Sequence, residues 1–248
     1  MSPTLLSSIA RPLKPVALQR PRPTMDWRLT KWVRKAAGAA PSFKLGIFAG
    51  IHGDERAGML AAGQLFREMS EPGHPEFRDF ELHFYPVCNP TGRNLGTRHN
   101  HRGLDLNREF WAGSAEPEVI YLEGELRRER YDGIVALHAD DDVEGCYGFV
   151  SGALLSEHLL DPALDAAAVH LPRELAPVID GFAAERGIIK EGYPGILSAP
   201  PEQRPQALEI VFETPGRAPM DLQVAASVAA VKAILAGYRQ LQAYSANL

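Results

Sequence analysis

The sequence has few cysteines and no excess of basic residues. Cys88 and Cys146 are too few and too far apart for a disulfide framework, so we expect two buried thiols that behave as small apolar side chains. The chain carries 26 lysines and arginines against 31 aspartates and glutamates, a formal net charge of −5. Proteins that bind nucleic-acid phosphates are usually basic, so we expect no nucleic-acid partner.

Long apolar runs are also missing. No run approaches the ~18 consecutive apolar residues that cross a bilayer, so the sequence predicts no membrane-spanning segment and no membrane partner. The first 25 residues lack acidic side chains, as targeting sequences do, but they have neither a continuous apolar core nor a clear cleavage site. We therefore predict a cytoplasmic protein without a signal peptide. The sequence does not indicate an oligomeric state.

The length of 248 residues, with 45% hydrophobic residues, is sufficient for one large domain with a real core. Five prolines fall within residues 1–24, which predicts an irregular N-terminal arm followed by a single domain over residues 25–248. Short apolar runs predict strands at 44–51, 81–88, 133–138, 147–150, 188–193 and 207–213. Helical spacing predicts helices at 26–37, 55–69, 116–131, 162–184 and 219–244, with loops at 89–115 and 194–205. Alternating strands and helices indicate an α/β fold.

Three of the predicted strands end at polar residues. His52 and Glu55 follow the first strand in a His-x-x-Glu pattern, His138 ends a buried run, and Glu213 ends the last strand. Ligands of open α/β sheets bind at the carboxyl ends of strands, so these side chains are candidates for one site. Imidazole and carboxylate groups are zinc ligands, and a catalytic zinc takes three protein ligands. The sequence therefore predicts a metal site formed by His52, Glu55 and His138.

The predicted loop at 89–115 is rich in arginine. It contains Arg93, Arg98, Arg102 and Arg108, and loops of this length are uncommon unless they are functional. A solvated basic loop and a nucleic-acid contact are alternatives, but the acidic chain disfavours the second. Arginine binds carboxylates bidentately, so a cluster beside a metal site suits an anionic substrate.

Five short segments occur in an order that is typical of one family. They are Gly50-Ile-His-Gly-Asp-Glu55, Asn89-Pro90, Gly103-Leu-Asp-Leu-Asn-Arg-Glu-Phe110, Leu137-His-Ala-Asp140 and Phe212-Glu-Thr214. With these motifs the sequence resembles the zinc carboxypeptidase superfamily (peptidase family M14), which includes the succinylglutamate desuccinylase/aspartoacylase branch. The resemblance implies a three-layer sandwich whose central sheet is mixed and largely parallel, with helices on both faces. It also implies that residues 25–248 form one catalytic domain.

The resemblance implies roles for particular residues. One Zn²⁺ per chain would be held by His52, Glu55 and His138. Glu213 matches the catalytic glutamate, which takes a proton from the attacking water and passes it to the leaving amine.

The substrate-binding residues implied by the resemblance lie on two segments. Asn107 and Arg108 match the pair that grips the terminal carboxylate of the substrate. Arg98, with Arg93 as the alternative, matches the arginine that stabilises the oxyanion, so Arg98 counts as catalytic. Tyr193 matches a mobile tyrosine that contacts the substrate.

The sequence therefore predicts a zinc-dependent hydrolase that cleaves an amide bond next to a free carboxylate. The preferred activity is removal of a C-terminal residue from a peptide, with cell-wall peptides among the candidates. The first alternative is deacylation of an N-acyl amino acid, which the short interval between Glu55 and His138 favours. A non-catalytic module that binds anions is the alternative of another class.

Overall fold

The computed structural model describes residues 27–37, 43–71, 74, 77–153 and 156–245. The predicted N-terminal arm at 1–24 lies outside the described residues. Within them, nine strands form one sheet in the order β1-β3-β2-β4-β9-β5-β8-β7-β6. The strands are β1 (Trp32–Arg34), β2 (Phe43–Ala49), β3 (Phe80–Tyr85), β4 (Gly133–Asp140), β5 (Tyr147–Gly152), β6 (Val178–Ile179), β7 (Phe182–Glu185), β8 (Ile188–Ile189) and β9 (Leu208–Pro215).

The centre of the sheet is parallel and its flanks are largely antiparallel. Strands β3, β2, β4 and β9 run in one direction, whereas β1 pairs antiparallel with β3 and β5 pairs antiparallel with β9. The carboxyl ends of the four parallel strands therefore meet at one edge, which is where α/β sheets bind ligands.

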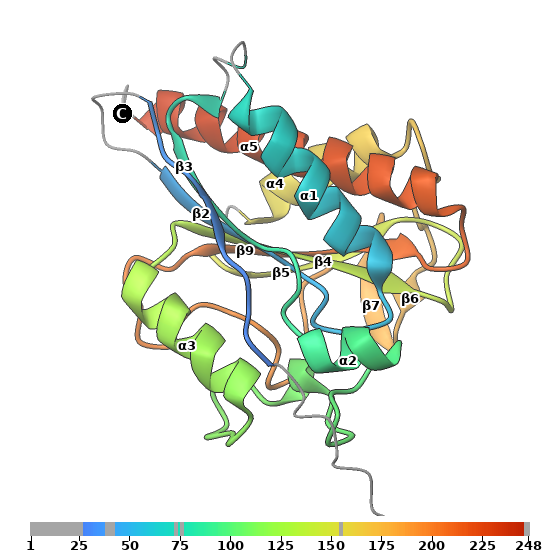
Figure 1. The fold of residues 1–248 in the computed structure, drawn as a ribbon. Helices are drawn as coiled ribbons and strands as arrows, with labels where there is room; N and C mark the ends of the chain where they lie inside the picture. The colour runs from blue at the N-terminus through green and yellow to red at the C-terminus, as the bar shows by residue number, and fades with distance from the viewer. Residues whose placement is uncertain (1–26, 38–42, 72–73, 75–76, 154–155, 246–248) are drawn as a thin grey trace, which may run out of the picture.

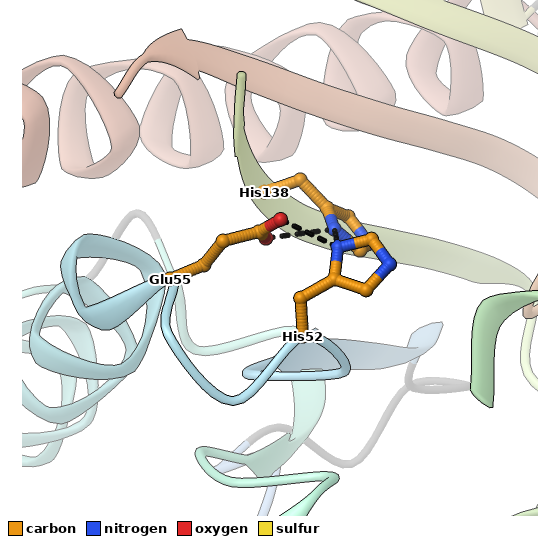
Figure 2. Close-up of side chains that lie close together, drawn as sticks. All are labelled: His52, Glu55 and His138. Carbon is orange, nitrogen blue, oxygen red and sulfur yellow. Dashed lines mark hydrogen bonds and ion pairs between the residues drawn. The ribbon is translucent and has the colours of Figure 1, made fainter. Parts of the chain in front are cut away.

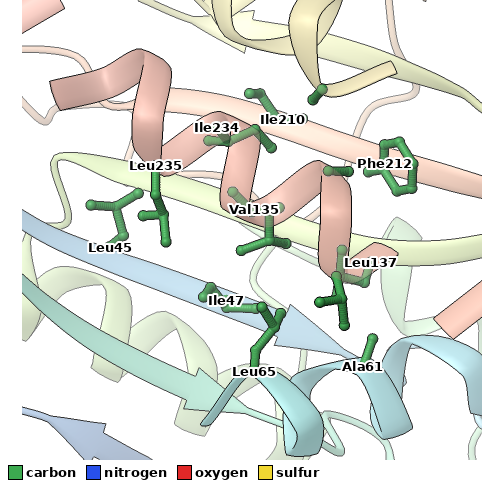
Figure 3. Packing of buried hydrophobic residues seen from close by; sticks show 14 of the residues in the cluster. Leu45, Ile47, Ala61, Leu65, Val135, Leu137, Ile210, Phe212, Ile234 and Leu235 are labelled. Atoms are coloured by element: carbon green, nitrogen blue, oxygen red, sulfur yellow. The ribbon is translucent and has the colours of Figure 1, made fainter. Parts of the chain in front are cut away.

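Helices cover both faces of the sheet (Figure 1). One face carries α1 (Arg56–Ser70), α4 (Ser156–Ala167) and α5 (Met220–Ser245), and the other carries α3 (Pro117–Glu129), with the short α2 (Pro90–Leu95) beside it. Because side chains alternate across a strand, Leu45 and Ile47 of β2 pack beneath α1 and α5 (Figure 3), while Phe48 joins the cluster under α3. The predicted three-layer α/β sandwich with a mixed sheet is confirmed.

Helix α5 is apolar along most of its length. By length and composition its segment Met220–Leu241 could cross a membrane, which the apolar-run argument missed because small and polar residues interrupt it. In the fold, Val231, Ile234 and Leu235 of this helix are buried against the sheet. A helix that packs on a protein core has a similarly apolar composition.

Two secondary-structure predictions are wrong. The helix predicted at 26–37 is an extended segment that contains β1, and Asp26 lies outside the described residues. Arg34 in β1 donates hydrogen bonds to the carbonyls of Met69, Phe77 and Phe80, so tertiary contacts outweigh the local apolar spacing. The helix predicted at 162–184 belongs to α4 only up to Ala167. Beyond it, Pro172 and Pro177 disfavour helix, and a hairpin of β6 and β7 follows.

The predicted loop at 89–115 is more ordered than its composition suggests. It contains α2 and a 3₁₀ turn, η2 (Leu106–Arg108). Asn89 caps α2 by accepting a hydrogen bond from the Gly92 amide, and Pro90 occupies the first turn. Asp105 caps η2 by accepting from the Asn107 amide. Capping side chains, and not apolar periodicity, therefore fix this segment.

A partly buried charged network between the sheet and α3 makes stability depend on pH. Burial opposes ionisation of Glu129, but hydrogen bonds from Lys31, Lys44 and Arg128 outweigh it and lower the pKa of Glu129 to about 2. A carboxyl group with a lowered folded-state pKa stabilises the fold above its unfolded pKa of ~4.3 and loses that contribution as pH falls toward the folded value.

We therefore expect the free energy of unfolding to fall between pH 4.5 and 2, with about 1–3 kcal/mol of the loss attributable to Glu129. In Glu129→Gln that part of the loss is absent and stability at pH 7 is lower. Urea unfolding at several pH values measures both. The matched control is Glu202→Gln, whose side chain is 66% exposed. Parallel pH profiles for native protein and Glu129→Gln would contradict the assignment.

Candidate metal centre

His52, Glu55 and His138 converge at the carboxyl edge of the parallel strands (Figure 2). His52 lies in the loop after β2, Glu55 immediately precedes α1, and His138 lies near the end of β4. The Nδ1 atom of His138 is 3.2 Å from Nδ1 of His52 and 2.9 Å from a carboxylate oxygen of Glu55. The other oxygen of Glu55 lies 2.5 Å from Nδ1 of His52. All three side chains are at least nine-tenths buried.

The electrostatics of this cluster suit a bound cation. Burial opposes the charge on Glu55, but its contacts with His138 and His52 lower its pKa, so it is a carboxylate. Burial lowers the pKa of His138, which keeps that imidazole neutral and able to coordinate. Two ring nitrogens and a carboxylate directed at one buried point form a donor set that fits a divalent metal such as zinc.

Asp105 orients His52. Its carboxylate lies 3.1 Å from Nε2 of His52, and this contact assigns the proton to Nε2 and leaves Nδ1 facing the cluster. Burial opposes protonation of His52, yet hydrogen bonds to Asp105 and Glu55 raise its pKa to about 9, so a metal that binds Nδ1 displaces a proton. The sequence analysis assigned no role to Asp105, although it lies inside the Gly103–Phe110 motif.

The loop that carries His52 is fixed to α2 by Gly53 and Asn89. A Cβ on Gly53 would lie 2.1 Å from the carbonyl carbon of Gly92, so only glycine fits. The fully buried Asn89 accepts from the Gly92 amide and donates to the carbonyls of Ile51 and Arg98. Asn89 was also missed as a site residue. Its signal was its position after a strand and before proline, which is typical of a helix cap.

A cleft of about 480 Å³ opens beside the cluster. Glu213 on β9 lines it and stands directly across from His138 on β4 in the strand register. Burial and the negative charge of Glu55 raise the pKa of Glu213 well above its ordinary value. A carboxyl group with a raised pKa holds a proton that an ordinary glutamate would lose, which is a property that suits a general acid–base residue.

The two candidate arginines for the oxyanion lie in different places. Arg98 lines the cleft and is held by Asp105, which accepts from its Nε at 3.1 Å and its Nη2 at 3.0 Å. Its Nη1 lies 3.8 Å from Glu55, next to the metal cluster. Arg93 is exposed on α2 and does not line the cleft, so the structure brings only Arg98 to the cluster.

The predicted carboxylate clamp also lines the cleft. Asn107 is buried in η2 and its side-chain oxygen accepts from the Leu197 amide at 2.9 Å, so its Nδ2 group remains available as a donor. Arg108 donates to the carbonyl of Asn107, and within the described part of the chain no carboxylate forms an ion pair with it. Tyr193 lies beside Arg108, whose guanidinium carbon is 4.0 Å from the centre of the ring. The cleft therefore holds an unneutralised cation next to the candidate metal ligands.

Comparison with known proteins agrees with this geometry. Residues 41–132 match the family model described as the succinylglutamate desuccinylase/aspartoacylase catalytic domain. The chain is also similar to murein peptide amidase A of Escherichia coli, with 36% identity over 86 residues, which cover 34% of this chain and 33% of that protein. The match thus spans about a third of that relative's length.

Two solved structures have a similar fold over most of this chain. A candidate metallopeptidase from Shewanella denitrificans is 25% identical with a TM-score of 0.67, and the match covers 84% of this chain and 83% of the other. A metallo-carboxypeptidase from Burkholderia cenocepacia is 21% identical with a TM-score of 0.66, covering 85% of this chain and 61% of the other. The chain shares the fold of these metallopeptidases. The resemblance predicted from the sequence motifs is confirmed.

The close contact at Gly53 predicts the behaviour of one conservative substitution. Gly53→Ala places a methyl group against the backbone of α2, so the loop that carries His52 and Glu55 must shift. We expect the affinity for Zn²⁺ to fall about 10- to 100-fold, as for other changes behind a metal ligand. Competition with a chromophoric chelator measures this affinity. Gly124→Ala, at a helical position with open space around it, is the control and retains native affinity. Native affinity in Gly53→Ala would contradict this account of the loop.

Proposed function

We propose that this protein is a zinc-dependent amide hydrolase that removes a C-terminal residue from a peptide. The observation that carries the proposal is a shared cleft, which His52 and Glu55 of the buried cluster line together with Glu213 and Arg108. The carboxyl group of Glu213 has a raised pKa, and Arg108 forms no ion pair with a carboxylate among the described residues. An amide bond next to a free carboxylate is the substrate that suits these three features together.

His52, Glu55 and His138 would hold the zinc ion, with Asp105 keeping His52 in the coordinating tautomer. When bound, zinc supplies a Lewis acid that polarises the scissile carbonyl and lowers the pKa of an attacking water to about 7. The fit rests on the donor set and on the convergence of the two Nδ1 atoms with the carboxylate.

Glu213 moves the proton. As a carboxylate it accepts the proton of the attacking water, and as an acid it returns that proton to the nitrogen of the leaving amine. Its position across from His138 keeps it beside the ligand cluster. Arg98, already oriented by Asp105, donates toward the negative charge that develops on the carbonyl oxygen.

Asn107 and Arg108 bind the terminal carboxylate of the substrate. The Nδ2 group of Asn107 donates one hydrogen bond, and the guanidinium of Arg108 supplies charge and further donors. This fixed anchor sets which amide bond lies next to the metal ligands, so the substrate is positioned before the chemical step.

The wall of the cleft carries several acidic residues. The lining contains five aspartates and three arginines, namely Asp54, Asp140, Asp141, Asp142, Asp180, Arg56, Arg98 and Arg108. A substrate with an ammonium group besides its terminal carboxylate suits this mixture of charges. Cell-wall peptides containing a diamino acid have both groups, and the similarity to a murein peptide amidase supports the same substrate class.

An N-acyl amino acid deacylase is the second candidate. The match of residues 41–132 to the desuccinylase/aspartoacylase model supports it, since that segment contains His52, Glu55 and the Arg108 loop. Such a substrate also presents a carboxylate next to an amide, so the same clamp serves both reactions. A non-catalytic anion-binding module is the remaining alternative. It has no need of an acid–base residue, so it does not account for the raised pKa of Glu213 beside the cluster.

The role of Glu213 predicts a loss of turnover without loss of metal. In Glu213→Gln we expect kcat to fall about 10²- to 10⁴-fold, because the amide cannot accept the proton. Zinc affinity stays within about threefold, since Glu213 is not a proposed ligand. The control is Glu209→Gln on the same strand, where the carboxyl group contacts Ser151 and the Ala199 amide outside this cleft. Unchanged turnover in Glu213→Gln would rule out the mechanism.

The carboxylate clamp predicts substrate preference. Peptides with a free C-terminus should be cleaved at least about 100-fold faster, in kcat/KM, than the same peptides with a C-terminal amide. Liquid chromatography of the products measures both rates. The series includes peptides ending in a diamino acid, N-acetyl amino acids and N-succinyl amino acids. Turnover of the N-acyl amino acids without cleavage of any peptide would replace the peptidase by the deacylase.

A further inference from the structure

Tyr193 contacts one cationic and one aromatic side chain. The guanidinium carbon of Arg108 lies 4.0 Å from the centre of the tyrosine ring, and the rings of Phe182 and Tyr193 pack in a T-shaped arrangement with their centres 4.9 Å apart and an interplanar angle of 80°. A guanidinium over a tyrosine face is attracted by the electrons of the ring. The ring therefore restricts where the guanidinium of Arg108 can lie.

The hydroxyl of Tyr193 is also held. It donates to Asp180, whose side-chain oxygen is 3.0 Å away and whose carbonyl oxygen is 3.1 Å away. Asp180 and Gly181 form the tight turn between β6 and β7, with φ angles of +51° and +81°. The same hairpin supplies Phe182, so one rigid turn fixes both the ring and the hydroxyl of Tyr193.

The segment around Tyr193 docks directly on η2. The carbonyl of Gly195 accepts from the Phe110 amide at 3.1 Å, and the Leu197 amide donates to the side chain of Asn107. A Cβ on Gly195 would lie 2.3 Å from the carbonyl oxygen of Arg108, so the two segments touch through their backbones. Residues 193–197 thus support both members of the carboxylate clamp.

We propose that Tyr193 is a positioning residue for Arg108, acting through its ring, and that Asp180 holds Tyr193 in place. This inference rests on the proposed function, because it concerns the arginine that binds the substrate carboxylate. It differs from the role implied by the family resemblance, in which the tyrosine moves and contacts the substrate. Here the hydroxyl of Tyr193 serves the protein and not the substrate.

The experiment compares Tyr193→Phe, Tyr193→Leu, Asp180→Gly and Asp180→Asn in zinc-reconstituted protein. Tyr193→Phe keeps the ring and loses the hydroxyl, whereas Tyr193→Leu loses both. Asp180→Gly keeps the left-handed backbone and removes the side-chain acceptor, and Asp180→Asn restores an acceptor. Kinetics with a peptide substrate and calorimetric binding of succinate, a simple dicarboxylate, are the two readouts.

We expect Tyr193→Leu to raise KM and weaken succinate binding about 3- to 10-fold with kcat within about twofold. Tyr193→Phe and Asp180→Gly should change succinate affinity by less than about threefold, and Asp180→Asn should bind succinate as the native protein does. A large fall of kcat in Tyr193→Phe would overturn the inference, because the hydroxyl would then act on the substrate. Native KM and succinate affinity in Tyr193→Leu would overturn it as well.

Arg108→Gln separates failure of this inference from failure of the proposed function. If Arg108→Gln binds succinate as tightly as the native protein, Arg108 is not the clamp and the proposed function itself is wrong. If Arg108→Gln loses binding while Tyr193→Leu does not, the clamp stands and the positioning role of Tyr193 is rejected.

Discussion

The site depends on the contact between the loop after β2 and the start of α2. Gly53 lies against the backbone of Gly92, and the buried side chain of Asn89 joins Ile51, the α2 terminus and the carbonyl of Arg98. This contact sets the positions of His52 and Glu55 relative to β4, because α2 and the loop have no room to slide past each other. The loop that carries His52 and Glu55 therefore shares one support with Arg98.

A few contacts arrange the charged groups of the cleft. Asp105 bonds both His52 and Arg98, so one carboxylate orients a candidate ligand and a candidate oxyanion donor. Burial, together with the negative charge of Glu55, raises the pKa of Glu213. Arg108 donates to the carbonyl of Asn107 and lies over the ring of Tyr193, and it has no carboxylate partner within the described residues. Under the proposed function, this cation is available to the carboxylate of the substrate.

The order of the motifs predicts the fold and the convergence of His52, Glu55 and His138, because strand ends in a parallel sheet meet at one edge. Local patterns fail where tertiary contacts decide: Arg34 bonds three distant carbonyls and makes a strand of a segment with helical spacing. Asp105 acts through its contact with His52, which is far away in the sequence, and Asn89 acts by capping α2 and bonding Ile51. Sequence spacing alone does not indicate these contacts. The turn at Asp180 lies in a segment whose proline-broken spacing suggested helix, so its contact with Tyr193 had no signal in the sequence.

The most direct test of this account is a crystal structure of the protein grown with Zn²⁺, with anomalous data recorded on both sides of the zinc absorption edge. The account predicts one strong zinc peak per chain, coordinated by Nδ1 of His52, Nδ1 of His138 and the carboxylate of Glu55. The peak should lie in the cleft that Glu213 and Arg108 line. Absence of zinc from these three side chains, or zinc bound only elsewhere, would contradict the central claim.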